Sequence, residues 1–300
     1  MYFLLTNDVE DFSITLNEPD ADTANEVYKI GLPRLLDIYT KYEVQCTFYF
    51  TGKMAATIPE SVELVLEHGH EIGCHGYDHW PQKSFELMNY DEQVAELEKA
   101  KNAIEPIAGK VSSFRAPSLR ISDVTVKALE YTGFTSDSSI PSQRFDGPLS
   151  FSSKRKLRWL VAPRSPYFIS YNSIVAKGTS KVLEIPISSA IFPFVGTTMR
   201  ASPMISNLIE KILFFESSKM KRPIVFIFHP NECIDAKQDV VAVGRSTGVI
   251  EYIFADVIKQ RFKVRNMGDK AIKLVDGMLK RAKDRGFEFI TVREYRELMG

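Results

Sequence analysis

The chain has 300 residues, of which 44% are hydrophobic and 25% are charged, a composition typical of soluble globular proteins. Its 38 basic and 38 acidic residues cancel, so the charge balance gives no reason to expect a nucleic acid or an anionic membrane as partner. Three widely spaced cysteines without a CxxC pair argue against a disulfide framework and indicate a reducing compartment.

The N-terminal stretch predicts a cytoplasmic location. MYFLLTNDVEDF reaches an acidic residue at Asp8, too early for the apolar region of a signal peptide, and it lacks a basic flank. No apolar run approaches the roughly 18 residues that a membrane-spanning helix requires, so we expect no membrane span.

Strand and helix patterns alternate along the chain. Strands are predicted at residues 2–6, 44–51, 70–75, 111–117, 181–188, 223–229 and 287–292. Helices are predicted at 23–42 with a kink or restart at Pro33, at 59–68, from an N-cap at Asp91, and at 122–132, 204–215 and 269–285. The alternation predicts an α/β fold with a mainly parallel sheet, open or closed.

Two stretches interrupt this alternation. Residues 142–180 are polar, basic and aromatic with little helical period, which predicts loops or a small β insertion. Residues 231–267 combine a mixed polar segment with a basic one and are interpreted as a lid. Because the chain shows no internal repeat and no low-complexity tract, we expect one domain over residues 1–300 with these two insertions.

Ionisable side chains follow several of the predicted strands. They are Asp8, Glu10 and Asp11 after the first strand, His75 and His79 after the third, Arg115 after the fourth, and His229 at the end of PIVFIFH. Functional sites of parallel α/β folds form at the carboxyl ends of strands, so we expect these side chains to meet.

His75 and His79 are spaced so that their imidazoles can share a divalent ion. Gly76 stands where the HExxH motif of zinc proteases has its glutamate, so a base must come from elsewhere, and TNDVED (6–11) is the obvious source. One of its carboxylates can complete a two-histidine, one-carboxylate site, and another can deprotonate water. Each feature alone is commonplace, but together they predict a metal site that binds water beside a base.

These motifs resemble, in order, those of the polysaccharide deacetylase family, also called the NodB-homology domain or carbohydrate esterase family 4. The similar segments are FLLTNDVEDF (3–12), CTFYFTG (46–52), GHEIGCHGYDH (69–79), FRAP (114–117), GFTSDSSI (133–140) and FIFHPNE (226–232). The first has a DVED form in place of TFDDG, and LEIPIS (183–188) with PFVGTTMRASP (193–203) resembles a bacterial exopolysaccharide-deacetylase subgroup. The resemblance covers nearly the whole chain and implies a distorted (β/α) barrel, often of seven parallel strands.

The reaction implied by the resemblance is hydrolysis of an N-acetyl amide on an amino sugar or glycan. Asp8 would be the general base toward water activated by a divalent ion, and His229 the general acid that protonates the leaving amine. The backbone N–H of Ser118 would stabilise the oxyanion. Arg115 would hold Asp8 through a charge-assisted pair, and Asp137 would orient His229.

The metal ligands implied by the resemblance are His75, His79 and one carboxylate of the DVED segment, and the ligand types favour Zn²⁺. Val9 occupies the place of the ligating aspartate of TFDDG. Glu10 shares a strand face with the predicted base, whereas Asp11 needs a turn to reach the site. The sequence gives Glu10 and Asp11 about equal weight as the carboxylate that binds the metal.

Two other classes of function compete with the deacetylase. One is a small-molecule amide hydrolase similar to allantoinases or cyclic imidases, some of which work without metal; metal content and activity on ureides would discriminate it. The other is a degenerate barrel that only binds, which the presence of both a base and an acid argues against. The sequence specifies neither the glycan nor the oligomeric state.

Overall fold

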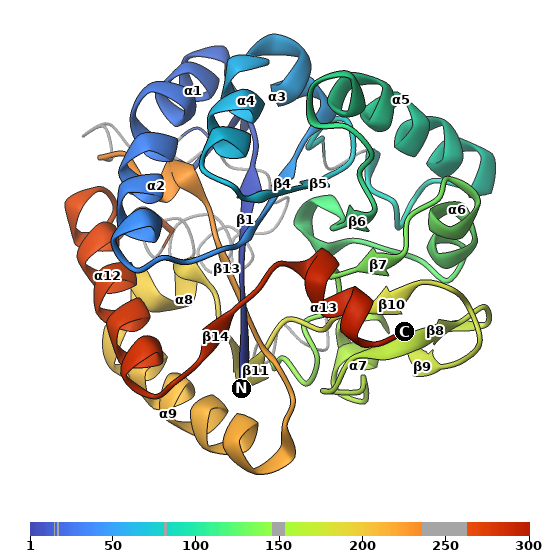
Figure 1. Ribbon diagram of the computed structural model, residues 1–300. Helices are drawn as coiled ribbons and strands as arrows, with labels where there is room; N and C mark the ends of the chain where they lie inside the picture. The colour runs from blue at the N-terminus through green and yellow to red at the C-terminus, as the bar shows by residue number, and fades with distance from the viewer. Residues whose placement is uncertain (15, 17, 81–82, 146–153, 236–262) are drawn as a thin grey trace, which may run out of the picture.

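The computed structural model shows a curled sheet surrounded by helices (Figure 1). It describes residues 1–14, 16, 18–80, 83–145, 154–235 and 263–300. Within the described residues, seven parallel strands follow one another around the sheet. In spatial order they are β13 (Ile224–Phe228), β1 (Tyr2–Val9), β4 (Thr47–Phe50), β5 (Glu71–Cys74), β6 (Ser113–Phe114), β7 (Ser136–Asp137) and β10 (Leu183–Glu184). The predicted α/β class and distorted barrel are confirmed.

The barrel closes where the chain after β10 reaches β13. The backbone N–H of Ser188 donates to the carbonyl oxygen of Val225 at 3.1 Å, and the backbone N–H of Val225 donates to Ser188 Oγ at 2.9 Å. Shorter elements complete the sheet: β14 (Glu288–Phe289) pairs with the start of β1, and the antiparallel hairpin β8 (Tyr167–Ser170) and β9 (Ser173–Lys177) extends β10. The short β6, β7 and β10 account for the distorted outline.

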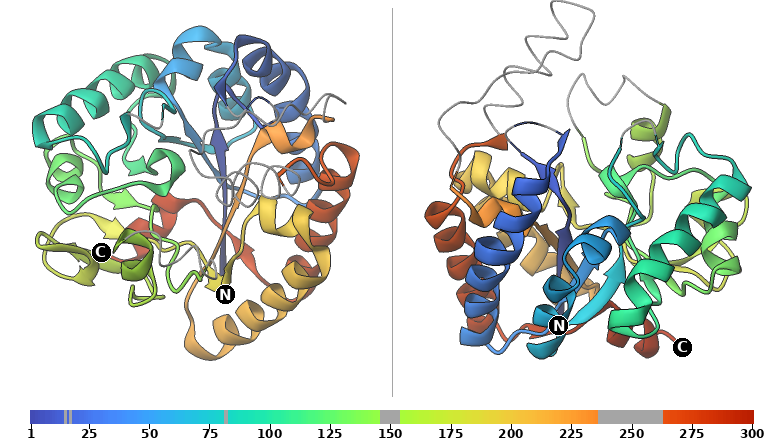
Figure 2. Two further views of the ribbon diagram at one scale, coloured as in Figure 1. Left: turned by 180° about the vertical axis from the view of Figure 1, so that it is seen from behind. Right: turned by 90° about the horizontal axis from the view of Figure 1, so that it is seen from above.

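Helices occupy the outside of the sheet, as both views of Figure 2 show. They are α1 (Ala21–Glu26), α2 (Leu32–Lys41), α3 (Gly52–Thr57), α4 (Glu60–Glu67), α5 (Tyr90–Ala108), α6 (Thr125–Tyr131), α7 (Lys154–Trp159), α8 (Gly196–Ala201), α9 (Pro203–Met220), α12 (Asp269–Asp284) and α13 (Val292–Leu298). The short helices α3, α7, α8 and α13 have no counterpart among the predicted elements. None of the described helices is long and apolar enough to cross a bilayer.

Two helix boundaries differ from the prediction. The helix expected at 23–42 contains a π-helical turn at Val27–Gly31, and Pro33 follows that turn as the second residue of α2. The N-cap of α5 is Asn89, not Asp91. The Asn89 side chain accepts the N–H of Glu92 and the Glu92 carboxylate accepts the N–H of Asn89, a capping box that fixes the helix start.

Strand alternation divides the buried apolar residues into two clusters. The outer cluster lies between strands and helices and includes Phe3, Leu5, Phe48, Phe114 and Phe226. The inner cluster fills the barrel and includes Leu4, Tyr49, Leu183, Val225, Ile290 and Tyr295. Since side chains two residues apart on a strand share a face, Thr6 and Asp8 continue the inner row of β1 beyond Leu4. Asp8 therefore lies where β1 ends, and this end of the strand is opposite both chain termini (Figure 2).

The two expected insertions differ in how much of them the structure describes. The first, 142–180, contains α7 and the β8–β9 hairpin. The second, 231–267, begins in the 3-10 turn Pro230–Cys233, and its residues 236–262 lie outside the described residues. The single-domain division stays a prediction.

Candidate active site

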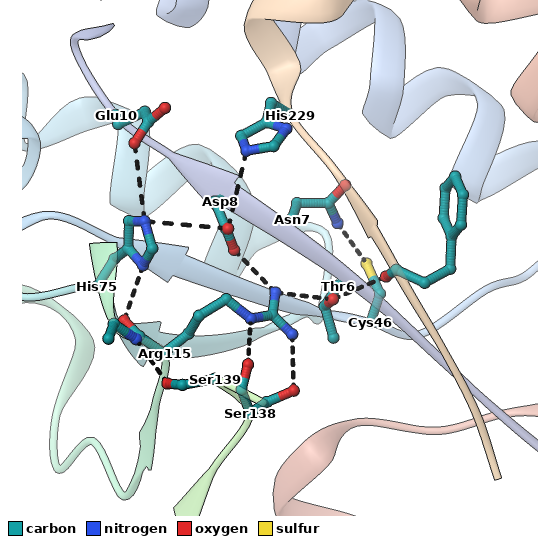
Figure 3. Close-up of polar contacts among 12 residues, drawn as sticks. Thr6, Asn7, Asp8, Glu10, Cys46, His75, Arg115, Ser138, Ser139 and His229 are labelled. Atoms are coloured by element: carbon teal, nitrogen blue, oxygen red, sulfur yellow. Dashed lines mark hydrogen bonds and ion pairs between the residues drawn. The ribbon is translucent and has the colours of Figure 1, made fainter. Parts of the chain in front are cut away.

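Most of the side chains predicted at the strand ends meet at one mouth of the barrel (Figure 3). Asp8 Oδ2 lies 3.9 Å from His75 Nε2 and 3.8 Å from His229 Nε2. Glu10 Oε2 lies 3.7 Å from His75 Nε2 and 3.2 Å from His79 Nε2. All five side chains line a cavity of about 290 Å³. Segments more than 200 residues apart along the chain therefore build a single site.

Glu10, His75 and His79 are arranged to hold a metal ion. One ligand atom from each lies within 4.8 Å of the others. Glu10 Oε2 is buried and has no hydrogen-bond partner among the described residues, and burial raises the pKa of Glu10 to about 7. A buried carboxylate oxygen that faces two imidazole nitrogens and lacks a donor is costly unless a proton or a cation meets it. This donor set fits Zn²⁺.

Asp11, the other carboxylate considered as a ligand, points elsewhere. Its Oδ2 forms an ion pair with Lys53 Nζ at 2.5 Å, and it is not in the group of three. Glu10 reaches the histidines because it lies two residues after Asp8 and continues the inner row of β1. The structure thus brings Glu10 rather than Asp11 to the candidate metal site.

The hydrogen bond at the far nitrogen of His75 sets its tautomer. His75 Nδ1 lies 2.8 Å from the carbonyl oxygen of Arg115, which can only accept, so Nδ1 carries the hydrogen. The lone pair of Nε2 then faces Glu10. Burial lowers the pKa of His75, and burial together with the nearby His229 lowers that of His79 to about 4. Both imidazoles are therefore neutral near pH 7, the form that binds metal.

Asp8 is paired with a fully buried arginine. Arg115 Nη1 donates to Asp8 Oδ1 at 2.8 Å, while Arg115 Nε and Nη2 donate to the carbonyl oxygen and Oγ of Ser138, both at 2.9 Å. Burial alone would raise the pKa of Asp8, but Arg115, His75 and His229 outweigh it and hold that pKa below its usual value. Asp8 is thus ionised, as a base must be, and the predicted Arg115–Asp8 pair is present.

His229 contacts a second carboxylate through its other ring nitrogen. His229 Nδ1 lies 2.8 Å from Glu232 Oε1. Burial would lower the pKa of His229, but the hydrogen bond and charge of Glu232 and the charge of Asp8 raise it to about 9. Arg200 and His229 overcome the effect of burial and lower the pKa of Glu232. An imidazolium held this way near pH 7 is the form that a general acid needs.

Among the described residues, the structure pairs Asp137 with Ser139 and places Glu232 at His229 Nδ1, so the orienting role predicted for Asp137 gains no support. Asp137 accepts a hydrogen bond from Ser139 Oγ, and its register neighbours on the adjacent strands are Phe114 and Glu184. Phe114 belongs to the outer cluster, so alternation turns Asp137 to the helix-covered face of the barrel, whereas His229 follows the inner row.

Glu232 and Arg200 are site residues that the sequence prediction missed. The available signal was the spacing in HPNE, where a carboxylate follows the histidine by three residues across a proline and a short turn brings both together. Arg200 lies in a segment quoted only for its resemblance, and nothing in the sequence indicates that its guanidinium is buried.

Ser118 lies in the same cavity as the histidines. Its backbone has a positive φ of 53°, and its Oγ is 3.5 Å from His79 Nε2. A non-glycine residue in the left-handed region stores backbone strain and is frequent at functional sites. The structure thus brings Ser118 to the site, while the oxyanion role of its N–H stays a prediction.

Known proteins share the sequence pattern and the fold. The pattern of the polysaccharide deacetylase family matches residues 22–136. A peptidoglycan deacetylase from Helicobacter pylori is 30% identical over 118 residues, which are 39% of this chain and 39% of that protein. The chain thus matches about two fifths of that relative's length.

Among solved structures, a "putative polysaccharide deacetylase" from Mycobacterium smegmatis is 19% identical with a TM-score of 0.53, and the match covers 94% of this chain and 92% of that one. A variant of a Bacillus anthracis protein, described as a CE4 family pseudoenzyme with restored enzymatic activity, is 15% identical with a TM-score of 0.50. That match covers 98% of this chain and 67% of the other. Both likenesses concern the fold alone. Because a pseudoenzyme shares it, activity has to be argued from the site residues.

Proposed function

We propose that the chain, whose residues 22–136 match the polysaccharide deacetylase family, is a metal-dependent hydrolase that removes N-acetyl groups from the amino sugars of a glycan. One observation carries this proposal: an ionised Asp8 and a protonated His229 line the same cavity as Glu10, His75 and His79. A binding module needs neither a proton acceptor nor a proton donor. The peptidoglycan deacetylase activity of the Helicobacter pylori relative suggests the substrate class.

The metal-binding residues would be Glu10, His75 and His79, and Zn²⁺ is the ion that we propose. A bound divalent ion polarises an amide carbonyl and makes water more acidic. The two histidines are neutral and Glu10 Oε2 lacks a donor, so these residues offer lone pairs rather than protons to the cavity. The carboxylate also offsets part of the ion's charge.

Asp8 and His229 carry the two proton transfers. Asp8, kept ionised by Arg115, accepts a proton from the water that attacks the acetyl carbon. The N–H of Ser118 would stabilise the negative charge that develops on the carbonyl oxygen. His229 then gives its Nε2 proton to the amide nitrogen, the C–N bond breaks, and acetate and the free amine leave. Without this protonation the amine is a poor leaving group.

Acetate release combined with metal analysis tests the proposal. We expect the purified protein to contain about one metal ion per chain, because the described residues offer one three-ligand group. It should release acetate from oligomers of N-acetylglucosamine or from peptidoglycan fragments; chelation should abolish the release and Zn²⁺ should restore it. Hydrolysis of allantoin that is insensitive to chelation, with no acetate release, would instead identify a ureide hydrolase.

Replacing Glu10 and Asp11 separately by alanine identifies which of the two carboxylates binds the metal. Glu10→Ala should weaken metal binding by at least roughly 10–100-fold, because two imidazoles alone form a weak site. Asp11→Ala should keep its metal, since the carboxylate it removes pairs with Lys53. Both side chains are buried, so the two variants are matched in the loss of a buried charge. Elemental analysis after dialysis makes the comparison, and equal metal loss in both variants would contradict the assignment.

A further inference from the structure

A buried ion pair lies behind His229, at the ring nitrogen that faces away from Asp8. Glu232 is fully buried and Arg200 is 1% exposed. Arg200 Nε donates to Glu232 Oε2, and Glu232 Oε1 lies 2.8 Å from His229 Nδ1. We propose that Glu232, held by Arg200, is the positioning residue that fixes the tautomer and orientation of His229 as the proton donor. This inference rests on the proposed deacetylase function.

The guanidinium of Arg200 is anchored on several sides. Its Nη1 donates to the carbonyl oxygens of Lys263 at 2.6 Å and Arg265 at 2.9 Å, and Asn266 Nδ2 donates to its backbone carbonyl at 2.7 Å. A planar guanidinium whose Nε and Nη1 both donate hydrogen bonds has little freedom to move. The Glu232 carboxylate is therefore held against a fixed partner rather than a mobile surface charge.

The backbone around the HPNE turn leaves room for this arrangement. A Cβ added at Gly196 would lie closer than 3.0 Å to both carboxylate oxygens of Glu232 and to the Phe228 ring. On another side, a Cβ added at Gly31 would lie closer than 3.0 Å to the carbonyl oxygen of Pro230. Two glycines from distant parts of the chain thus allow the turn that carries His229 and Glu232 to sit where it does.

Among the charged groups near His229, Glu232 makes the shortest contact. The others are Asp8 from β1, Glu10 just after β1, His79 from the loop after β5, Arg200 from α8, and Arg144 and Lys263 in the cavity wall. Asp8 Oδ2 is 3.8 Å from His229 Nε2, beyond hydrogen-bond distance. A carboxylate on one ring nitrogen fixes the hydrogen there and directs the other nitrogen to the reacting atom.

The orienting carboxylate therefore belongs to the same short turn as the acid. Asp137, which the family resemblance would assign to this task, faces the outer side of the barrel and pairs with Ser139. In this chain the acid and its orienting group are three residues apart, and Arg200 from α8 completes the arrangement. The chemistry is that of a carboxylate–imidazole pair, with the guanidinium as a third member.

Titration of the His229 imidazole by NMR tests the inference without any substrate. Glu232→Gln should lower the pKa of His229 by roughly 1–2 pH units, because it removes an adjacent negative charge and keeps the side-chain size. Asp137→Asn is the matched control and should leave that pKa unchanged within about 0.3 unit. Since acetate release is not needed, this measurement stands even if the deacetylase proposal fails.

Kinetics on the proposed substrate give the second readout. An acid must be protonated, so activity falls as pH rises through its pKa; burial would lower the pKa of His229, but Glu232 and Asp8 raise it to about 9. Glu232→Gln should move this fall to lower pH and reduce kcat about 10–100-fold, less than the 10²–10⁴-fold of a lost acid. Glu232→Asp should recover part of both effects. Metal content should not change, because Glu232 is outside the ligand group.

Two results would overturn the inference. One is an unchanged pKa of His229 in folded Glu232→Gln; the other is a fall of that pKa in Asp137→Asn as large as the fall in Glu232→Gln. If Glu232→Gln does not fold, Gly196→Ala decides, because its methyl group displaces the carboxylate without changing any charge. It should lower the pKa of His229 in the same direction, and an unchanged value there would count equally against the role of Glu232.

Discussion

Replacing Asp8 by asparagine is expected to leave the metal content unchanged and to lower turnover by about 10²–10⁴-fold. Asparagine has the shape of aspartate but cannot accept a proton from water near neutral pH. Metal should remain because Asp8 is not among Glu10, His75 and His79. The measurement is kcat for acetate release together with elemental analysis of the same preparation.

Asp11→Asn provides the matched control for this variant. Asp11 and Asp8 are both 4% exposed and lie in the same segment, but Asp11 pairs with Lys53 instead of Arg115. Its loss should change turnover only a few-fold.

Stability has to be checked in Asp8→Asn, because breaking a buried ion pair can cost about 3–5 kcal/mol of unfolding free energy. The asparagine oxygen can still accept from Arg115, so the loss should be smaller. Thermal unfolding followed by circular dichroism would separate a folding defect from a catalytic one. Near-normal turnover in a folded, metal-loaded variant would remove Asp8 from the mechanism.

Much of the site was predictable because its residues follow strands that are easy to recognise. Apolar runs before Asp8, His75 and His229 mark buried strands, and parallel strands end at the same edge. Closure of the barrel was less visible, since β10 has only two residues in regular pairing and the contact between Ser188 and Val225 consists of one backbone and one side-chain hydrogen bond. Patterns of hydrophobicity do not report such contacts.

The sequence was least informative about which face of a strand a residue occupies and which residues lie beside it. Asp137 stands in the expected motif, but its face is set by register with Phe114 and Glu184, and a shift of one residue reverses it. Glu10 and Asp11 could be separated only once the end of β1 was known. Sequence spacing predicts proximity along one element well, but contacts between short elements depend on tertiary packing.

Replacing His75 by alanine is expected to remove the metal and the activity together. The variant keeps only Glu10 and His79 from the ligand group, and two ligands bind a divalent ion weakly. It also removes the Nδ1–H that meets the carbonyl oxygen of Arg115, so that buried oxygen loses its donor. Metal stoichiometry after dialysis and acetate release are measured on the same sample.

His70→Ala separates this effect from the cost of deleting any buried imidazole. His70 is 6% exposed and precedes β5, while His75 follows it, so the two variants truncate the same side chain at opposite ends of one strand. His70 Nδ1 lies 3.7 Å from Cys46 Sγ, outside the candidate metal site, and its loss should leave the metal in place. If His75→Ala is folded and has only a weakened affinity for metal, excess Zn²⁺ should restore part of its metal content. Full occupancy at stoichiometric metal would exclude His75 as a ligand.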